Sequence, residues 1–270
     1  MQIIANNITT RNPRISAILR QGASAGNGGA PGACPGLQDV AQSCMAVGAD
    51  ILEINLQQRY DDPEIMKIAV NNIQQAVDCQ LCLSSYKPAT LEAGIKLCRR
   101  PPIINYLAVD TRPIQEILSL TARYRTELVL LVSDPTAPAD ARDMLGKAAI
   151  LVGAAVAAGI PNERLILDPG ISHVTKEPGQ RHLVEVVQFI KAVPETFDPP
   201  VRTTCWINNS SSGAESRLRP VIESSLLFFL SGLGISSAFI DVLRRENSRA
   251  IRLLKIFNNE KIYADAVLAL

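Results

Sequence analysis

Residues 50–85 read DILEINLQQRYDDPEIMKIAVNNIQQAVDCQLCLSS, which is a strand pattern, a helix pattern and a second strand pattern in succession. Both outer runs are mainly apolar and end in polar residues, the first at Asn55 and the second at Ser84 and Ser85. The helix begins at Asp62 and Pro63, because Asp caps a helix and Pro suits its first turn. Strands buried on both faces and joined through a helix indicate a βαβ unit with parallel strands.

The same pattern recurs along the chain. Six further apolar runs carry Asn, Asp or Ser at their ends: QIIANN, PIIN, ELVLLVSD, RLILDP, CWINNS and SAFID. Their polar ends are Asn6 and Asn7, Asn105, Asp134, Asp168, Asn208 and Asn209, and Asp241. Eight strands that alternate with helices close into a (β/α)8 TIM barrel, whose active site lies at the C-terminal ends of the strands. We therefore predict one α/β domain over residues 1–270, with the polar strand ends around one mouth.

The segments between the runs predict the helices. Helical patterns cover about residues 37–47, 180–192 and 246–257, and others begin at Pro88, at Pro113 and at Pro220. Residues 21–36 differ, because they read QGASAGNGGAPGACPG. A stretch so rich in Gly and Ala predicts a flexible loop, which we place on the active-site face of the barrel.

Composition excludes several classes of protein. The net charge of +1 gives no electrostatic reason to expect a nucleic acid or an anionic membrane as partner. No apolar run approaches the roughly 20 residues that a bilayer span requires. The N-terminus also lacks the basic start and apolar stretch of a signal peptide. We therefore expect a cytoplasmic protein.

The cysteines and histidines do not form a recognisable metal site. The six cysteines show no disulfide framework, and we interpret them as buried or loop thiols. Cys79 and Cys82 have metal-like spacing, but the pair occurs once and Cys82 lies inside a predicted strand, whereas a zinc site needs four ligands. His173 and His182 flank one loop and are interpreted as surface or loop residues. We expect no metal.

Five stretches together resemble a known family. They are GADILEIN, LCLSSYKPATLEAGIKLC, PIINY, LILDPGI and INNSSSGAESR, and the likeness extends from Gly48 to Asp241. The chain resembles pterin-binding TIM barrels, and within them the methyltetrahydrofolate:corrinoid methyltransferases, while LDPGI also resembles the more distant dihydropteroate synthases. The resemblance implies a homodimer that takes methyltetrahydrofolate or a related tetrahydropterin, and a partner protein that carries cobalamin or another corrinoid.

The resemblance also implies roles for particular residues. Asp168 matches the Asp that accepts both donors of the pterin ring edge in a bidentate pair. Asn105 matches an Asn that can donate and accept at once. The pterin-binding residues expected on this basis are Asn55, Ser84, Asn105, Asp168, Asn209, Ser211, Arg217 and Asp241.

Asn209 is the expected catalytic residue. A methyl group on the pterin N5 leaves from an amine, which is a poor leaving group, and the barrier falls if charge developing on N5 is met by a hydrogen bond. The Asn that matches Asn209 in the family reaches N5. Ser211, Gly213 and Arg217 follow at the family spacing. Asn208 is adjacent, so the sequence leaves open a register one residue earlier.

The chain departs from the family at three points. Ser84, Ser85 and Tyr86 stand where the family has Asp-Ser-Thr, so a pterin-facing carboxylate is missing. Strand 1 ends in Asn6 and Asn7 rather than Glu-Arg, and Tyr106 replaces a small residue after Asn105. If the lost carboxylate is the only defect, Ser84→Asp should tighten the binding of a folate-type pterin.

These departures indicate a divergent member and leave three functions open. The first is methyl transfer between a tetrahydropterin and a corrinoid protein. The second is a non-catalytic pterin-binding or assembly subunit. The third is a dihydropteroate synthase-like reaction, which is weakened because we find no basic Lys and Ser-Arg segment near the seventh predicted strand.

Overall fold

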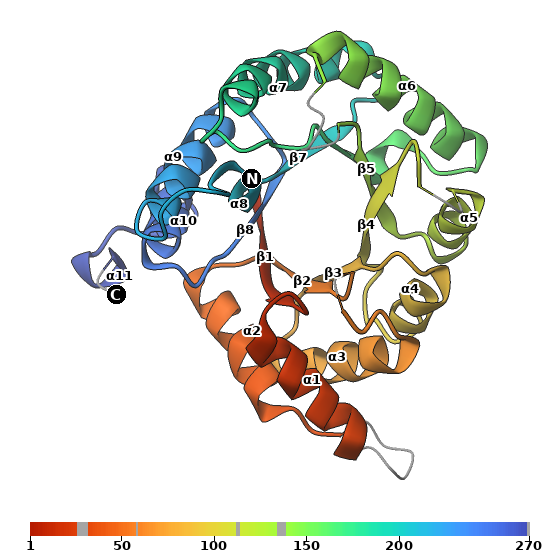
Figure 1. Cartoon of the computed structure of the whole chain (residues 1–270), viewed down its shortest axis with the longest axis vertical. Coiled ribbons are helices and arrows are strands. Elements are labelled where there is room, and N and C mark those ends of the chain that lie inside the picture. Colours follow the sequence, from red (N-terminus) through yellow and green to blue (C-terminus); the bar gives the residue numbers. More distant parts are fainter. Residues whose placement is uncertain (26–31, 58, 112–113, 134–138, 269–270) are drawn as a thin grey trace.

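The chain forms a closed barrel of eight parallel strands in a computed structural model that describes residues 1–25, 32–57, 59–111, 114–133 and 139–268. Each strand pairs with its neighbours in chain order, and β8 closes the ring on β1. The strands surround the centre in Figure 1, and the helices form an outer layer. The predicted (β/α)8 TIM barrel is confirmed. The strands are β1 (Gln2–Thr9), β2 (Ile51–Asn55), β3 (Gln80–Ser84), β4 (Ile103–Ala108), β5 (Glu127–Leu131), β6 (Leu165–Asp168), β7 (Arg202–Trp206) and β8 (Ser237–Ile240).

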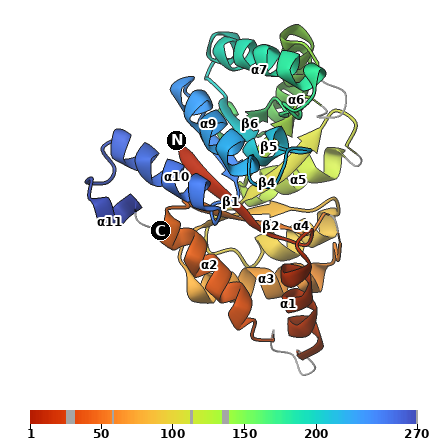
Figure 2. The same cartoon turned by 60° about the vertical axis from the view of Figure 1, so that its left-hand side comes forward.

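The helices follow the strands around the ring. They are α1 (Pro13–Ala25), α2 (Pro35–Val47), α3 (Pro63–Ala76), α4 (Pro88–Ile95), α5 (Ile114–Tyr124), α6 (Ala141–Ala157), the 3-10 turn η1 (Asn162–Arg164), α7 (Glu177–Thr196), α8 (Ile207–Ser210), α9 (Arg219–Gly232), α10 (Arg245–Phe257) and α11 (Asp265–Leu268). Figure 2 shows α1, α2 and α3 together on one side of the barrel. The start of α3 is as predicted, because Asp62 Oδ1 accepts the backbone N–H of Glu64 at 2.8 Å.

The prediction of a Gly-rich loop at residues 21–36 is wrong at both ends of this range. Helix α1, which the sequence did not predict, includes residues 21–25, and α2 begins at Pro35. Ile15 and Leu19 are buried, so packing of this apolar side against the barrel stabilises the helix despite Gly22. A side chain at Gly22 would collide with Cys34 Sγ. The centre of the predicted loop, residues 26–31, lies outside the described residues.

Other boundaries also differ from prediction. The run CWINNS is not all strand, because β7 ends at Trp206 and the next four residues form α8, where Ser210 Oγ donates to the Ile207 carbonyl oxygen at 2.7 Å. Helix α4 begins at Pro88 as predicted, and α7 is longer than the predicted residues 180–192. The predicted strand end at Asp134 and helix start at Pro113 lie outside the described residues.

Alternate residues of each strand face the barrel interior. One apolar layer there consists of Ile4, Ile51, Cys82, Ile103, Val129, Ile166 and Phe239. Two residues further along the same strands come Asn6, Glu53, Ser84, Asn105, Leu131, Asp168 and Asp241, which the strand period places on the same inner face. A mainly polar layer therefore lies on an apolar one, towards the C-terminal ends of the strands.

Two irregularities in the strand pairing occur in this polar layer. The register of β1 against β2 shifts between Ala5 and Ile8, and that of β4 against β5 shifts between Ile104 and Leu107. Such bulges change the direction of local side chains and are common beside active sites. Here they contain Asn6 and Asn7 in β1, and Asn105 and Tyr106 in β4.

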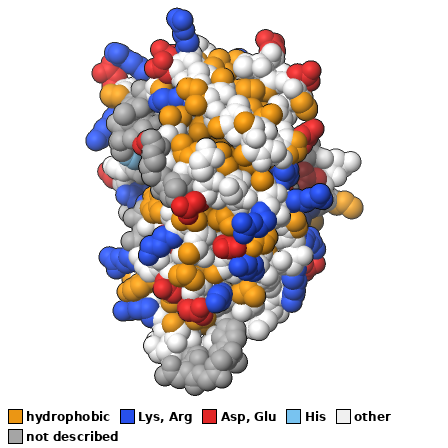
Figure 3. Space-filling model, turned by 90° about the vertical axis from the view of Figure 1, so that its right-hand side faces the viewer, with side chains coloured by type: hydrophobic (Ala, Val, Ile, Leu, Met, Phe, Trp, Pro, Cys, Tyr) orange, Lys and Arg blue, Asp and Glu red, His pale blue; other side chains and the backbone are white. Residues whose placement is uncertain are grey.

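The outer surface is mixed in character. On the face that Figure 3 shows, Lys and Arg side chains lie among Asp and Glu side chains, with apolar groups between them. Among the described residues, no helix is long and apolar enough to cross a membrane.

Candidate functional site

A cavity of about 460 Å³ opens at the C-terminal ends of the strands. Its size is within the range of small-molecule sites. It is lined by Asn6, Asn7, Thr9, Arg11, Asn12, Asn55, Gln57, Tyr86, Tyr106, Leu131, Asp168, Gly170, Trp206, Asn208, Asn209, Ser212, Asp241 and Arg244. The cavity is therefore where the strand ends predicted it.

The structure brings together some of the predicted site residues and separates others. Asn55, Asp168, Asn209 and Asp241 all line the cavity. Arg217 does not, because its side chain is 81% exposed and pairs with Glu215 at 2.8 Å.

The remaining predicted residues are buried behind the cavity wall. Ser84 and Asn105 lie beneath it and contact Glu53. Ser211 is buried and donates to Glu223 at 2.5 Å, so it supports the wall of the cavity. Its neighbour Ser212 lines the cavity instead.

Asp168 presents a carboxyl group from the end of β6. Its side chain is 3% exposed, and Oδ1 accepts the backbone N–H of Gly170 at 2.8 Å. Burial raises the pKa of Asp168 to about 7, and the hydrogen bond from Gly170 opposes this rise. Such a group accepts a pair of ring donors when ionised, and it binds one proton when the cavity is empty at mildly acid pH.

Asn208 and Asn209 differ in what holds them, although both line the cavity. Asn208 Oδ1 accepts from Asn6 Nδ2 at 2.8 Å and from the backbone N–H of Asp241 at 3.0 Å. The side-chain amide of Asn209 has no hydrogen-bond partner among the described residues. The backbone carbonyl oxygen of Asn209 lies 2.9 Å from His173 Nδ1. The side chain of Asn209 is thus available to a ligand, and that of Asn208 is used to join β1, α8 and β8.

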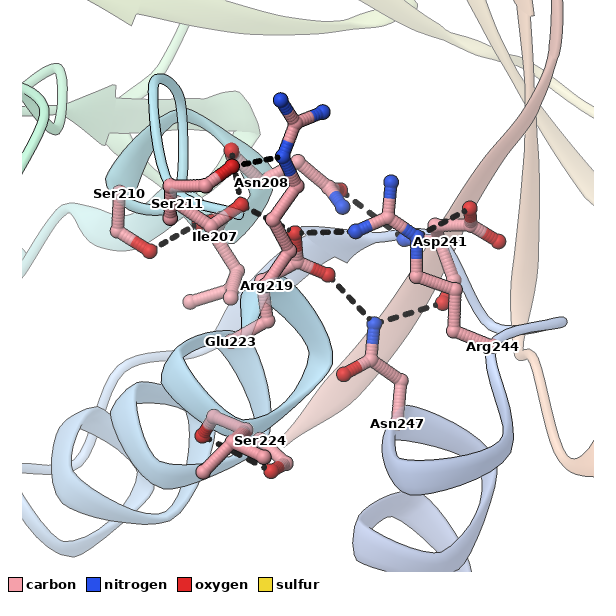
Figure 4. Close-up of polar contacts among 12 residues, drawn as sticks. Ile207, Asn208, Ser210, Ser211, Arg219, Glu223, Ser224, Asp241, Arg244 and Asn247 are labelled. Carbon is pink, nitrogen blue, oxygen red and sulfur yellow. Dashed lines mark hydrogen bonds and ion pairs between the residues drawn. The ribbon is translucent and has the colours of Figure 1, made fainter. Parts of the chain in front are cut away.

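A buried ionic network supports α8 from behind (Figure 4). Glu223 of α9 is 0% exposed, and its Oε1 contacts Arg244 Nη1 at 2.7 Å and Ser211 Oγ at 2.5 Å. Its Oε2 accepts from Asn247 Nδ2 at 2.7 Å. Arg244 also pairs with Asp241 at 3.0 Å, so the network connects α9 and α10 to the cavity rim. Both oxygens of Glu223 are satisfied, one of them by a cation.

Another buried carboxyl lies inside the barrel, on β2. Glu53 of β2 is 0% exposed, and its Oε1 accepts from Ser84 Oγ, from Asn55 Nδ2 at 3.1 Å and from Asn105 Nδ2 at 3.2 Å. Burial raises the pKa of Glu53 to about 7, while the bonds from Ser84, Asn55 and Asn105 lower it. This carboxyl changes the expectation for Ser84→Asp, because the new carboxylate would stand beside Glu53.

Aromatic rings form part of the cavity wall. Trp206 stacks on Phe239 with ring centroids 5.0 Å apart, and it also lines the cavity. Tyr86 and Tyr106 also line the cavity, and burial together with the hydrogen bond between them raises the pKa of Tyr106.

Sequence reasoning missed much of the cavity lining and its supports. The missed residues include Arg11, Gln57, Trp206 and Arg244 in the lining, and Glu53 and Glu223 behind it. For Glu53 a signal was present, since a charged residue in the middle of the buried run DILEIN is unusual. Glu223 and Arg244 carried no such signal, because a charge on a helix or after a strand is ordinary.

The histidine prediction needs one correction. His182 lies in α7 and is 2% exposed, with Nδ1 at 3.0 Å from the Ala139 carbonyl oxygen and Nε2 at 2.6 Å from that of Gly170. It is therefore a core residue rather than a surface or loop residue, with a backbone carbonyl oxygen within hydrogen-bond distance of each ring nitrogen. All six cysteines are free thiols, and within the described ranges no group of three or more His, Cys, Asp or Glu could hold a metal ion.

Comparison with known proteins defines the class. A profile described as pterin binding enzyme matches residues 27–219, and the chain belongs to this family. The resemblance predicted from the five sequence stretches is thereby confirmed. The chain is 23% identical to the methylcorrinoid:tetrahydrofolate methyltransferase of Eubacterium limosum over 191 residues, which are 70% of this chain and 69% of that protein.

Solved structures agree on the fold. The dihydropteroate synthase of Yersinia pestis with a pterine–sulfa conjugate matches with a TM-score of 0.68 and 14% identity, covering 96% of this chain and 94% of that one. The dihydropteroate synthase of Clostridium difficile, in the presence of pteroic acid, matches with a TM-score of 0.67 and 16% identity, covering 95% and 96%. At these identities the likeness concerns the barrel alone.

Proposed function

We propose that this protein transfers a methyl group between N5 of a tetrahydropterin, of the methyltetrahydrofolate type, and the cobalt of a corrinoid protein. The observation that carries the proposal is that Asp168 and Asn209 line the same cavity, each with a side chain available to a ligand. The methyltransferase of Eubacterium limosum, whose name specifies a methylcorrinoid and tetrahydrofolate, supports this reaction class.

In this proposal Asp168 and Trp206 bind the pterin, and Asn209 acts in the methyl transfer. Ionised Asp168 accepts the two donors at the guanidine-like edge of the pterin, which fixes the ring in the cavity. Trp206 offers a flat aromatic face to the ring. Asn209 then contacts N5 with its neutral amide, which stabilises the change of charge there but cannot supply a full proton.

The transfer itself is a displacement. The carbon–N5 bond breaks while a carbon–cobalt bond forms from the electron pair of cobalt(I), and N5 ends with a proton from solvent. The corrinoid is a substrate brought by a partner protein, so the partner must dock over the cavity mouth at the C-terminal ends of the strands.

Two other functions remain as alternatives. A dihydropteroate synthase-like reaction agrees with the fold neighbours, but their likeness is structural only. A non-catalytic pterin-binding subunit agrees with the departures at Ser84 and at Asn6 and Asn7. The methyltransferase is favoured over both because Asn209 lines the cavity and its side-chain amide has no hydrogen-bond partner among the described residues, which leaves it available for the role that the resemblance implies.

Asn209→Ala tests the proposal through catalysis. We expect the rate of methyl transfer from methyltetrahydrofolate to cob(I)alamin to fall by roughly 10²–10³, because one preorganised hydrogen bond is lost in the transition state. Pterin affinity should fall much less, since the interaction is stronger in the transition state than in the ground state. The assay follows the cobalt absorbance anaerobically, and calorimetry measures the affinity.

The controls separate the three functions. Asn258→Ala, at the exposed C-terminal end of α10, should leave both measurements unchanged. If the unmodified chain binds pterin but transfers no methyl to free or protein-bound cobalt(I), the binding-subunit function replaces the methyltransferase. If the unmodified chain condenses a pterin diphosphate with 4-aminobenzoate, the synthase function replaces the methyltransferase.

A further inference from the structure

The polar layer beneath the cavity contains a cluster contributed by three adjacent strands. Glu53 of β2, Ser84 of β3 and Asn105 of β4 are each at most 1% exposed. Asn105 Nδ2 donates to Glu53 Oε1 at 3.2 Å and to Ser84 Oγ at 3.0 Å, and Ser84 Oγ donates to the same Glu53 oxygen. Three neutral donors, with Asn55 as the third, thus converge on one carboxyl oxygen.

The other half of this cluster is unsatisfied. Glu53 Oε2 and Asn105 Oδ1 are both buried and have no hydrogen-bond partner among the described residues. A buried acceptor without a donor costs about 1–3 kcal/mol, so native proteins rarely leave two in one cluster unless a missing partner completes it. When Glu53 is ionised both orphaned atoms are acceptors, so the missing partner must then bring N–H or O–H donors.

Glu53 also determines how the two neighbouring amides point. An Asn side chain has two N–H donors on one side and one carbonyl oxygen on the other. Both donors of Asn105 are used inside the cluster, so its carbonyl oxygen is its remaining group. Asn55 is fixed in the same way, since its Nδ2 donates to Glu53 and its Oδ1 accepts the backbone N–H of Gln57 at 3.1 Å.

The cluster lies directly under the cavity. Asn55 and Gln57 line the cavity, and Gln57 Nε2 lies 3.4 Å from the backbone oxygen of Asn105. Tyr106, the next residue of β4, is in the cavity wall. A ring that enters between Gln57 and Tyr106 is therefore next to two residues that adjoin Asn105.

We propose that Glu53 is a positioning residue of the pterin site, which replaces from β2 the carboxylate missing at Ser84 of β3 and holds Asn105 as an acceptor for a donor of the pterin ring. The inference rests on the proposed function, which supplies the pterin. It assigns to Ser84 the role of a donor to Glu53 rather than of a weakened pterin ligand. Burial raises the pKa of Glu53 to about 7, as expected for a carboxyl whose charge is completed only by an incoming donor.

Moving the carboxyl between the two strands tests this proposal. The variants are Glu53→Gln, Ser84→Asp and the double variant Glu53→Gln/Ser84→Asp, each titrated calorimetrically with methyltetrahydrofolate. Glu53→Gln should weaken binding about tenfold or more, because an amide in place of the carboxylate competes as a donor and releases Asn105 from its fixed orientation. Ser84→Asp should also weaken binding, since two carboxyl groups then share one buried space.

The double variant gives the decisive result. It has one carboxyl again, now on β3, so binding should recover to within about threefold of the unmodified chain. A purely structural role for Glu53 would lower the melting temperature without such rescue. Binding by Glu53→Gln equal to that of the unmodified chain, or a double variant no better than Glu53→Gln, would overturn the proposal.

Two further variants keep the test decisive. Glu127→Gln changes a glutamate at the start of β5, the opposite end of the barrel, and should leave affinity unchanged. A loss of affinity there equal to that of Glu53→Gln would also overturn the proposal. Should Glu53→Gln fail to fold, Ser84→Ala decides, since it removes one donor to Glu53 and should weaken binding about threefold; unchanged binding by it would contradict the proposal.

The same measurements show whether the proposal for Glu53 fails by itself or together with the proposed function. If the unmodified chain does not bind methyltetrahydrofolate, the proposed function fails and the role of Glu53 fails with it. If the unmodified chain binds and Glu53→Gln binds equally well, only the role of Glu53 fails. If binding depends on Glu53 but no methyl transfer occurs, the role of Glu53 stands in a pterin-binding protein that is not a methyltransferase.

Discussion

Glu53 and Glu223 are both 0% exposed, but their carboxyl groups differ in their hydrogen-bond partners. Glu223 meets donors on both oxygens, and one of them is the guanidinium of Arg244. Glu53 meets three neutral donors on a single oxygen, and its second oxygen has no partner in the described part of the chain.

The difference separates a buried group that holds the fold from one that awaits a ligand. A buried charge with a cation and a full set of hydrogen bonds is stabilised by what already surrounds it. A buried carboxyl that no cation contacts directly carries a desolvation cost that a bound donor can relieve; for Glu53 the charge of Arg11 offsets this cost only in part. Glu223 therefore belongs to the support of α8 and the cavity rim, and Glu53 to the floor of the binding site.

The largest expected effect is on the stability of the fold, and it is tested by replacing Glu with Gln at position 223 and at position 53. Glu223→Gln should lower the free energy of unfolding by about 3 kcal/mol, because it removes one partner of a buried ion pair. The estimate is at the low end because the Arg244 side chain is 32% exposed. Glu53→Gln should lower the free energy of unfolding far less at pH 8. Urea denaturation of both variants measures the contrast, and equal losses would contradict it.

A smaller effect is expected on ligand binding at the third buried carboxyl of the barrel. Asp168→Ala should weaken pterin binding by about 2–3 kcal/mol, because the ligand donors lose a charged acceptor. Calorimetry with methyltetrahydrofolate measures it, with Glu223→Gln as the comparison variant, in which the carboxyl of Asp168 remains. Unchanged affinity in Asp168→Ala would remove this residue from the site.

Stability should also depend on pH through Glu53. Its folded pKa is raised from 4.5 to about 7, so between these values the folded state binds more protons than the unfolded chain. Stability therefore falls as pH rises through this window. Glu53→Gln should make this fall shallower by about 3 kcal/mol between pH 4.5 and pH 8, whereas Ser84→Ala, which keeps the carboxyl, should not. Thermal melts across this range would contradict the prediction if the slope were the same in all three chains.

The smallest expected effect concerns the link between β1 and α8. Asn6 Nδ2 donates to Asn208 Oδ1 at 2.8 Å in a partly buried position. A double-mutant cycle with Asn6→Ala and Asn208→Ala should give a coupling energy of about 1 kcal/mol in urea denaturation. The pair Asn6 and Asn209 provides the control cycle, since no hydrogen bond joins those side chains. Equal coupling in both cycles would show that Asn208 is not the residue that joins α8 to β1.

Much of the architecture was predictable because it depends on local patterns. The buried run 51–55, the Asp62 cap and the polar strand ends each act over a few residues, and together they require parallel strands with helices between them. The positions of Asn55, Asp168 and Asp241 at one mouth follow directly, since the C-terminal ends of all barrel strands point the same way. Helix α1 was missed because its stability comes from packing Ile15 and Leu19 against the barrel, which outweighs the Gly-rich composition that follows.

Long-range contacts decided the rest of the site. The sequence alone predicted a (β/α)8 barrel with its polar residues at one end, because side-chain period and turn chemistry are local properties. Pterin binding was predicted only through the resemblance of five stretches to a known family. Only the tertiary structure decided that Asn209 rather than Asn208 has an available side chain, because Asn208 is bonded to residues about 200 and 33 positions away. It likewise decided that Glu53 lies beneath Ser84 and Asn105, since the stagger of neighbouring strands and the bulge in β4 bring these side chains together.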